Sequence, residues 1–255
     1  MKKTCLITGA SRGIGFATAV ALAEEGFDIA ALALPDPERM DDLRHKVGAL
    51  GRRFSSYELD LGKIEAHAEL IGRVIADFGA IDCLVNNAGV SVLSRGDLLE
   101  MSVDSYDRCF TINTRGTFFF TQAVARHMAG TQTAAGSYRS IVFITSSNAV
   151  AVSVERGEYC MSKTALSMAC KLFALRLAQH GIAVFEVQPG FILTEMTAPV
   201  KTKYDALIAQ GLTVESRWGI PDDVARVVRT MAAGLLPYTV AQEVRVDGGL
   251  MIKRF

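Results

Sequence analysis

TCLITGASRGIG, residues Thr4 to Gly15, joins a short apolar run to a glycine-rich turn and then to the helical pattern FATAVALAEEG. The apolar run predicts a buried strand, and the glycines after it permit a tight turn and a close backbone approach. The free amides at the start of the next helix form an anion site that suits a pyrophosphate. A glycine triplet alone is a weak signal, but the strand before it and the helix after it strengthen it. The stretch predicts a nucleotide site at Gly9, Ser11, Arg12, Gly13, Ile14 and Gly15.

The alternation of strand and helix continues to the end of the chain. Further strands are expected at 28–34, 53–59, 81–85, 139–145 and 182–187, and from Val244, with helices at 38–50, 64–78, 102–128 and 158–179 and from Pro221. Strands that alternate with helices imply right-handed crossovers and a mostly parallel sheet covered on both faces. We expect a single α/β domain over residues 1–255, a doubly wound Rossmann-type fold with a seven-stranded parallel sheet and helices on both faces.

Composition limits the classes of partner. The chain has 255 residues, half of them hydrophobic, with 27 basic and 27 acidic side chains, and so gives no electrostatic reason to expect nucleic acid or a membrane surface. Five cysteines without a CxxC pair predict reduced thiols. No uninterrupted apolar run of about 18 residues occurs. We expect a soluble, cytoplasmic protein, and no metal site, because His45, His67, His127 and His180 have no partner spacing.

A second motif, Tyr159-Cys160-Met161-Ser162-Lys163, lies in the stretch SSNAVAVSVERGEYCMSK, residues 146–163. If a helix begins just before Tyr159, as the run TALSMACKLFALRLA suggests, Tyr159 and Lys163 lie one turn apart on one face. An ammonium group there favours the ionised phenol, so Tyr159 becomes a usable proton donor and acceptor. A tyrosine and a lysine at this spacing also pack together on ordinary helix surfaces. The pair therefore indicates acid–base chemistry only together with other residues.

Ser146 is the first such residue. The expected strand 139–145 ends at Ser146, and ligands of open α/β sheets bind at the carboxyl ends of strands. A hydroxyl there can hydrogen-bond a substrate oxygen on which charge develops. Ser147 is the neighbouring alternative, and either serine would also serve to cap a turn. The Ser146, Tyr159 and Lys163 arrangement resembles the catalytic set of the short-chain dehydrogenase/reductase family, whose thirteen-residue step from serine to tyrosine selects Ser146.

Other motifs extend this resemblance over nearly the whole chain. The loop spacing G-x-x-x-G-x-G is similar to the family's version, and the motifs NNAG at 86–89, PGFILT at 189–194 and VRVDGG at 244–249 also resemble it. The resemblance implies reversible hydride transfer between a nicotinamide and a carbonyl or alcohol, and it favours members similar to 3-oxoacyl-[acyl-carrier-protein] reductase. A sugar, polyol or steroid alcohol is the alternative substrate. A nucleotide-binding regulatory protein without chemistry is the alternative from another class, because a fold alone does not fix function.

The resemblance also implies the roles of individual residues. Tyr159 would give its proton to the carbonyl oxygen, Ser146 would hold that oxygen, Lys163 would support Tyr159 and bind the ribose, and Asn113 would keep a relay water. Asp60, whose other interpretation is a helix cap, would contact the adenine. Beyond the glycine loop, the implied cofactor contacts are Asp60, Leu61, Asn87, Ala88, Gly89, Tyr159, Lys163, Pro189, Gly190, Ile192 and Thr194.

The end of the expected strand 28–34 bears on cofactor choice. A carboxylate there would bind the adenosine ribose hydroxyls and repel a 2′-phosphate. The resemblance puts Ala33 at that place, and Arg12 can reach a 2′-phosphate, so NADP(H) is favoured over NAD(H). Asp36 is the alternative ribose ligand, although its position between Pro35 and Pro37 indicates a turn residue.

Two further expectations concern the substrate and the assembly. Residues 194–216 are expected to form a substrate lid, with an apolar inner face at Met196, Val200, Tyr204, Ile208 and Leu212. The helix 158–179 has two apolar stripes, one with Leu166, Ala169, Cys170, Phe173, Ala174 and Leu177 and one with Met161, Met168, Leu172 and Leu175. Since the sheet needs only one stripe, a second copy should cover the other. We expect the helices 102–128 and 158–179 to pair with their copies about a two-fold axis, with Phe173 in the contact. The resemblance implies that two such dimers form a homotetramer.

Overall fold

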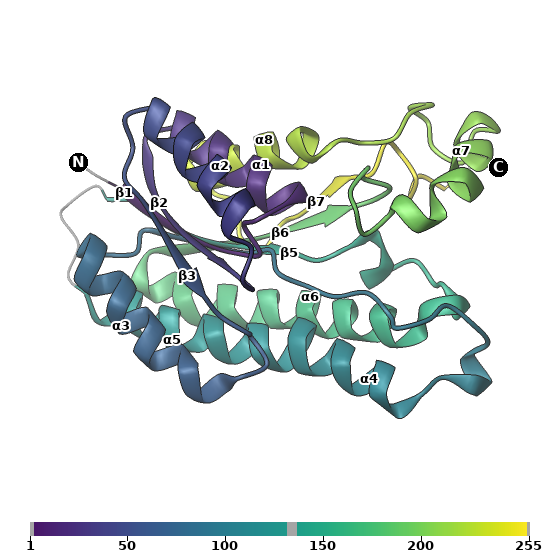
Figure 1. Ribbon diagram of the computed structural model, residues 1–255, viewed down its shortest axis with the longest axis horizontal. Coiled ribbons are helices and arrows are strands. Elements are labelled where there is room, and N and C mark those ends of the chain that lie inside the picture. Colours follow the sequence, from purple (N-terminus) through teal and green to yellow (C-terminus); the bar gives the residue numbers. More distant parts are fainter. Residues whose placement is uncertain (1–2, 132–136, 254–255) are drawn as a thin grey trace.

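The computed structural model describes residues 3–131 and 137–253 and contains one seven-stranded sheet (Figure 1). The strand order is β3-β2-β1-β4-β5-β6-β7, and every neighbouring pair is parallel. The predicted Rossmann-type sheet is therefore confirmed. The strands are β1 (Lys3–Thr8), β2 (Phe27–Ala33), β3 (Phe54–Glu58), β4 (Cys83–Asn86), β5 (Arg139–Ile144), β6 (Ile182–Pro189) and β7 (Glu243–Val246).

Helices cover both faces of the sheet. One layer contains α1 (Gly13–Glu24), α2 (Pro37–Ala49) and α8 (Pro221–Ala232), and the other contains α3 (His67–Phe78), α4 (Val103–Cys109), α5 (Thr117–Gly130) and α6 (Gly157–Leu177) (Figure 1). The short helix α7 (Lys201–Ala209) lies at one end of the molecule, outside both layers. Alternate residues of each strand supply the two cores: Ile7 packs under the first layer and Leu6 under the second.

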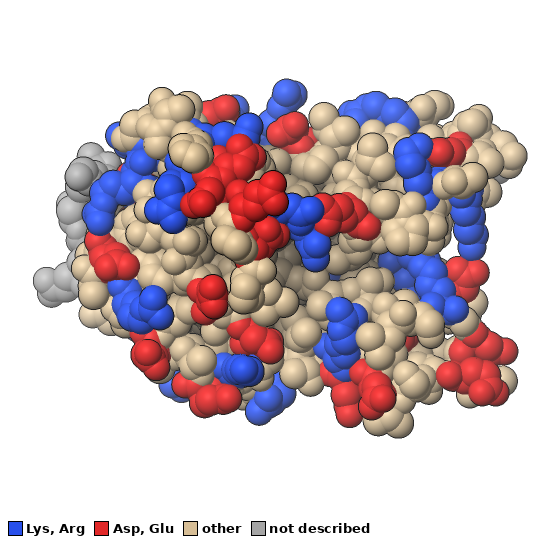
Figure 2. Space-filling model, viewed as in Figure 1, with Lys and Arg blue, Asp and Glu red and all other residues tan. Residues whose placement is uncertain are grey.

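The strand order reverses between β1 and β4, because the chain builds outward to β3 and then crosses back to the other side of β1. Open α/β sheets bind their ligands in the crevice at such a switch point, outside the carboxyl ends of the strands. The glycine loop follows β1 and the Asn86–Gly89 segment follows β4. The fold thus brings the glycine loop and the Asn86–Gly89 segment to one crevice. Figure 2 shows that the face seen in this view carries interspersed acidic and basic side chains and is hollowed near its centre.

The single helix expected over 102–128 is wrong. A π-helical stretch, Phe110–Gly116, separates α4 from α5 and contains the buried Asn113. A Cβ atom on Gly116 would lie only 2.4 Å from the carbonyl oxygen of Leu61, so the backbone of this stretch is pressed against the segment after β3. A π-bulge of this kind changes the direction of side chains within a helix and often marks a functional position.

The structure also bears on the expected stripes of α6 and on the expected loop at 129–137. The two apolar stripes of α6 are present: Leu166 and Phe173 are buried, whereas Leu172 is 56% exposed and Leu175 is 81% exposed. Phe173 packs on Phe143 of β5, with ring centres 6.1 Å apart, so its predicted place in a contact between subunits is wrong. The loop predicted over 129–137 lies in part on residues 132–136, outside the described residues, and α5 itself extends to Gly130.

Candidate active site

Tyr159 and Lys163 lie on one face of the first turns of α6, as their spacing predicts. Both are buried, and the Lys163 Nζ atom lies 5.8 Å from the centre of the Tyr159 ring. The ammonium group donates a hydrogen bond of 3.0 Å to the carbonyl oxygen of Ile144, the last residue of β5. This bond fixes the lysine against the end of the strand, so that its positive charge stays beside the phenol.

Ser146 lies two residues after the end of β5 and is 8% exposed. Its Oγ atom accepts a hydrogen bond of 3.1 Å from the amide of Asn148 and caps the short 3-10 turn Ser147–Ala149. Capping uses an acceptor lone pair of the hydroxyl and leaves its proton free to be donated. The two alternative readings of Ser146, a turn cap and a donor to a substrate oxygen, are therefore compatible.

Asn113 lies at the centre of a hydrogen-bond network behind these residues. Its Oδ1 atom accepts from the Val90 amide at 2.8 Å, and its Nδ2 atom donates to the Val90 carbonyl and to the Ser162 hydroxyl, both at 3.0 Å. A Cβ atom on Gly89 would lie 3.2 Å from Asn113 Oδ1 and 3.4 Å from Lys163 Nζ. Gly89 is therefore a point where the backbone passes close to both Asn113 and Lys163.

A thiol also lies in this region, on the last residue of α4. Burial raises the pKa of Cys109 to about 11, with a smaller contribution from the negative charge of Glu158. The thiol is therefore neutral near pH 7 and does not serve as a base there.

The glycine loop and the Asn86–Gly89 segment are joined by hydrogen bonds. The Thr8 hydroxyl accepts from the amides of Asn87 and Ala88, both at 3.0 Å, and the Asn87 side chain donates to the carbonyls of Thr8 and Gly9 at 2.9 and 3.0 Å. A Cβ atom on Gly15 would lie 2.2 Å from the Gly9 carbonyl oxygen. The loop is thus folded tightly onto the end of β4 where α1 begins.

Several other predicted cofactor residues lie at or after the ends of β3 and β6. Thr194 lies next to Gly13, since a Cβ atom there would be 3.4 Å from the Thr194 methyl carbon. The Gly190 amide donates to the Val246 carbonyl at 3.0 Å, which holds the end of β6 beside β7. Asp60 accepts a hydrogen bond of 2.9 Å from the Gly62 amide, in a turn rather than at a helix cap. The segment after β6 also contains Ile192, with Pro189 just before Gly190, and Leu61 directly follows Asp60.

Arg39 is a charged residue of this crevice that sequence reasoning missed. Arg12 and Arg39 both form ion pairs with Glu195, at 2.8 and 2.5 Å, and Arg39 also reaches Asp36 at 3.4 Å. Two guanidinium groups therefore lie together just beyond the end of β2. Since Arg39 and Glu195 are 156 positions apart in the chain, no local pattern could have predicted their pairing.

Arg156 is the second missed residue. Its guanidinium carbon lies 4.9 Å from the centre of the Tyr159 ring, and one of its terminal nitrogens donates to the Asn148 side-chain oxygen. Asn148 is the residue whose amide binds Ser146. Arg156 thus connects the turn that carries Ser146 to the ring of Tyr159. The sequence signal was present, because Arg156 lies three positions before Tyr159 and so comes within reach of it at the start of a helix.

The expected lid segment packs on the end of β6. On α7, Tyr204 packs against Phe191 with tilted rings whose centres are 4.3 Å apart, and Asp205 accepts a 2.7 Å hydrogen bond from the Trp218 indole. The predicted inner face is apolar only in part: Ile208 is buried and Val200, Tyr204 and Leu212 are partly buried, but Met196 is 50% exposed.

The residues present fit a dinucleotide. The glycine loop turns tightly at the end of β1, and α1 begins at its far end without a side-chain cap from Arg12, as suits an anion at a helix N-terminus. Gly89 keeps a side chain out of the space beside Asn113 and Lys163. Within residues 3–131 and 137–253, no group of three or more His, Cys, Asp or Glu side chains is placed to hold a metal ion. None of the helices that the structure describes has the length and apolar character needed to span a membrane.

A dinucleotide-type crevice with a serine, a tyrosine, a lysine and an asparagine gathered at one edge defines a class of nicotinamide-dependent oxidoreductases. Comparison with known proteins agrees with this class. The sequence profile described as short chain dehydrogenase matches residues 3–205. The chain belongs to the short-chain dehydrogenase/reductase family, as its motifs predict, and it is an NAD(P)-dependent oxidoreductase.

Individual relatives cover the whole chain. A 2-dehydro-3-deoxy-D-gluconate 5-dehydrogenase from Dickeya dadantii is 32% identical over 253 residues, which are 98% of this chain and 96% of the relative. The 3-oxoacyl-[acyl-carrier-protein] reductase FabG of Thermotoga maritima is 33% identical and covers 98% of each chain. A crystal structure of a 3-oxoacyl-[acyl-carrier protein] reductase from Brucella melitensis in complex with NAD has a TM-score of 0.95 and 40% identity, and it covers 100% of this chain and 99% of its own.

Proposed function

We propose that this chain transfers a hydride between a nicotinamide cofactor and a carbonyl or secondary alcohol, with Tyr159 as the proton donor and acceptor. The single observation that carries the proposal is the arrangement of Tyr159 and Lys163, which are buried together at the carboxyl edge of the sheet with 5.8 Å between the ammonium nitrogen and the ring centre. A bound nicotinamide supplies the hydride for reduction or accepts it in oxidation.

In the direction of reduction, the Tyr159 hydroxyl gives its proton to the carbonyl oxygen. The Ser146 hydroxyl donates a hydrogen bond to the same oxygen and stabilises the charge that develops there. The phenolate that remains on Tyr159 is stabilised by the Lys163 ammonium group, which is held in place by the Ile144 carbonyl. Asn113 holds the Val90 backbone and Ser162 behind Lys163, and we propose that it also keeps the water through which the proton is replaced.

Two substrate classes are candidates. A 3-oxoacyl thioester is the first proposal, supported by the resemblance of the motifs and by the names of two relatives. A sugar acid is the second, supported by the Dickeya relative and by a specific observation, the cationic Arg156 beside Tyr159. A steady-state assay distinguishes them, in which NADH and NADPH oxidation is followed with acetoacetyl thioesters and NAD+ and NADP+ reduction is followed with 2-dehydro-3-deoxy-D-gluconate. Absence of turnover with every carbonyl compound would contradict the proposed reaction.

The same assay tests cofactor choice. We propose that NADP(H) is preferred, because Ala33 offers no carboxylate at the end of β2 and because Arg12 and Arg39 lie together there. A 2′-phosphate would take the place of the Glu195 carboxylate between the two guanidinium groups. A preference for NADH larger than about 10-fold, equivalent to about 1.4 kcal/mol, would instead assign the ribose to Asp36.

We also propose that residues 194–216 close over the substrate and that the chain forms a homotetramer, with the exposed stripe of α6 in one contact. Leu172 and Leu175, at 56% and 81% exposure, form part of an apolar surface on the helix that carries Tyr159. Contact with a second copy would bury this surface and brace the helix. The single domain and the cytoplasmic location also stay predictions.

A further inference from the structure

We infer that Arg156 binds a carboxylate of the substrate, so that the natural substrate is a small oxo acid or hydroxy acid whose acid group lies only a few bonds from the reacting carbon. This inference rests on the proposed hydride transfer, since it assigns the reacting carbon to the space beside Ser146 and Tyr159. Of the two proposed substrate classes, it selects the acid over the 3-oxoacyl thioester. Arg156 precedes α6 and is half-buried at the side of that space.

The guanidinium group of Arg156 lies beside Tyr159. Its carbon lies 4.9 Å from the centre of the Tyr159 ring, and it donates to Asn148, whose amide binds the Ser146 hydroxyl oxygen. Arg156 therefore lies against the ring of Tyr159 and is linked through Asn148 to Ser146, the two residues that would contact the reacting oxygen. A group bound by Arg156 and a carbonyl bound by Ser146 and Tyr159 must belong to one small molecule.

The positive charge of Arg156 also favours an anionic ligand. Among the residues that the structure describes, no carboxylate forms an ion pair with Arg156, and its buried Nε atom has no hydrogen-bond partner. A guanidinium group has five N–H donors, and a cation that is partly removed from water without an anion is poorly compensated. A substrate carboxylate that contacts the terminal nitrogens would compensate it, because the planar guanidinium group matches carboxylate geometry.

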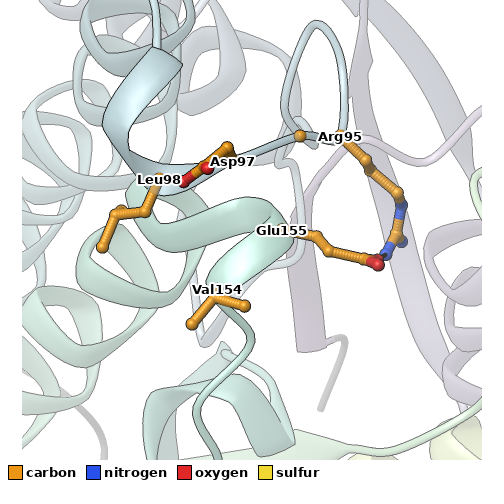
Figure 3. Close-up of a pocket in the computed structure, with 6 residues that line it drawn as sticks. Arg95, Asp97, Leu98, Val154 and Glu155 are labelled. Carbon is orange, nitrogen blue, oxygen red and sulfur yellow. Dashed lines mark ion pairs between the residues drawn. The ribbon is translucent and has the colours of Figure 1, made fainter.

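The acidic residues next to Arg156 in the sequence already have other partners. Glu155 accepts from Lys203 of α7 at 3.1 and 3.2 Å and lies 3.9 Å from Arg95. Figure 3 shows the Arg95 and Glu155 side chains reaching toward each other from separate segments, at the pocket lined by Arg95, Gly96, Asp97, Leu98, Val154 and Glu155. The buried Glu158 accepts from the Ser105 hydroxyl. Glu155 is thus shared between two cations, and Arg156 remains available to a ligand.

The expected ligand follows from this chemistry. A 3-oxoacyl thioester has no anionic group a few bonds from its carbonyl, whereas an oxo acid or a sugar acid has one. A charge-assisted hydrogen bond in a half-buried site changes affinity by about 10- to 100-fold. We therefore expect the site to distinguish an oxo acid from its own methyl ester by a factor of that size.

Binding is the measurement that decides the inference. Acetoacetate, 4-oxopentanoate and 5-oxohexanoate, each beside its methyl ester, are titrated calorimetrically into the protein with and without oxidised cofactor, which cannot react with a ketone. At least one acid should bind the wild-type chain about 10-fold or more tightly than its ester. The variant Arg156→Gln should lose this difference, and Arg156→Lys should retain part of it because it keeps the charge. Arg73→Gln is the matched control, since Arg73 also lies over a tyrosine ring, 5.7 Å from the centre of Tyr57.

The possible outcomes separate the inference from the proposed function. Equal binding of acid and ester by the wild-type chain overturns the inference, as does an equal loss for both in Arg156→Gln, which would mean that Arg156 only positions Tyr159 or Asn148. If the acids bind through Arg156 but no carbonyl compound oxidises NADH or NADPH, the carboxylate site stands and the proposed reaction fails.

Discussion

Replacing Gly15 by alanine tests whether the glycine loop is held by its contact with the segment after β4. Gly15 lies in the first turn of α1, and a Cβ atom there would lie 2.2 Å from the Gly9 carbonyl oxygen and 2.4 Å from the Asn87 side-chain nitrogen. Real Cβ atoms do not approach other atoms so closely. The loop must therefore move away from Asn87, whose two hydrogen bonds to the carbonyls of Thr8 and Gly9 would weaken.

The expected loss can be estimated from these contacts. Overpacking of this kind destabilises by about 1–3 kcal/mol, and each weakened hydrogen bond contributes roughly 0.5–1.5 kcal/mol. The gain from helix propensity is only about 1 kcal/mol. Gly15→Ala should therefore lower the free energy of unfolding by about 1–5 kcal/mol. It should also weaken NADH or NADPH binding, because the amides at the start of α1 are displaced.

Gly72→Ala is the matched control. Gly72 is inside α3, and an added Cβ atom would have no other atom within 4 Å, so the same substitution should stabilise the protein by up to about 1 kcal/mol. Urea unfolding followed by circular dichroism, together with titration of NADH or NADPH fluorescence, compares the two variants. If Gly15→Ala is as stable as Gly72→Ala and binds the cofactor like the wild type, the reasoning about this loop is refuted.

Two further predictions concern pH and assembly. Burial lowers the pKa of His67 below its unfolded value of about 6.5, so the unfolded chain takes up the proton first as pH falls. The stability that neutral His67 contributes should therefore decline below that pH. The difference in unfolding free energy between wild type and His67→Gln should shrink from about pH 7.5 to about pH 5. A difference that does not change with pH would argue against this role. Leu172→Glu places a charge on the exposed stripe of α6 and should give a smaller mass by sedimentation with the fold intact. Phe173→Glu should instead destabilise the fold itself, because Phe173 is buried. An unchanged mass for Leu172→Glu would exclude this face from the contact.

Signals that are local in the chain were predictable from the sequence. The glycine loop between β1 and α1 depends on neighbouring residues, and so does the placing of Tyr159 and Lys163 on one face of α6. Ser146 was predictable because it comes just after a buried strand. The two apolar stripes of α6 were also predictable from helical periodicity, but the pattern did not say which stripe faces the sheet. Phe173, a residue of the buried stripe, was therefore wrongly expected in the contact between subunits.

Features that depend on distant contacts were not predictable. The π-helical break at 110–116 includes Gly116, whose backbone lies against Leu61, and no helical pattern within 102–128 contains this contact. The pairing of Arg39 with Glu195 joins the start of α2 to the segment after β6. The role inferred for Arg156 rests on which acids are already paired around it, and this is known only once the loops are placed in space.

The rate of NADH or NADPH oxidation by Tyr159→Phe tests the central claim most directly. This substitution keeps the ring that packs beside Lys163 and Arg156 and removes only the hydroxyl group that would give up the proton. With whichever carbonyl compound the wild-type chain reduces, turnover should fall by at least about 100-fold, within the range of a positioned acid, while cofactor affinity barely changes. Turnover equal to that of the wild type would remove Tyr159 from the mechanism and contradict the account.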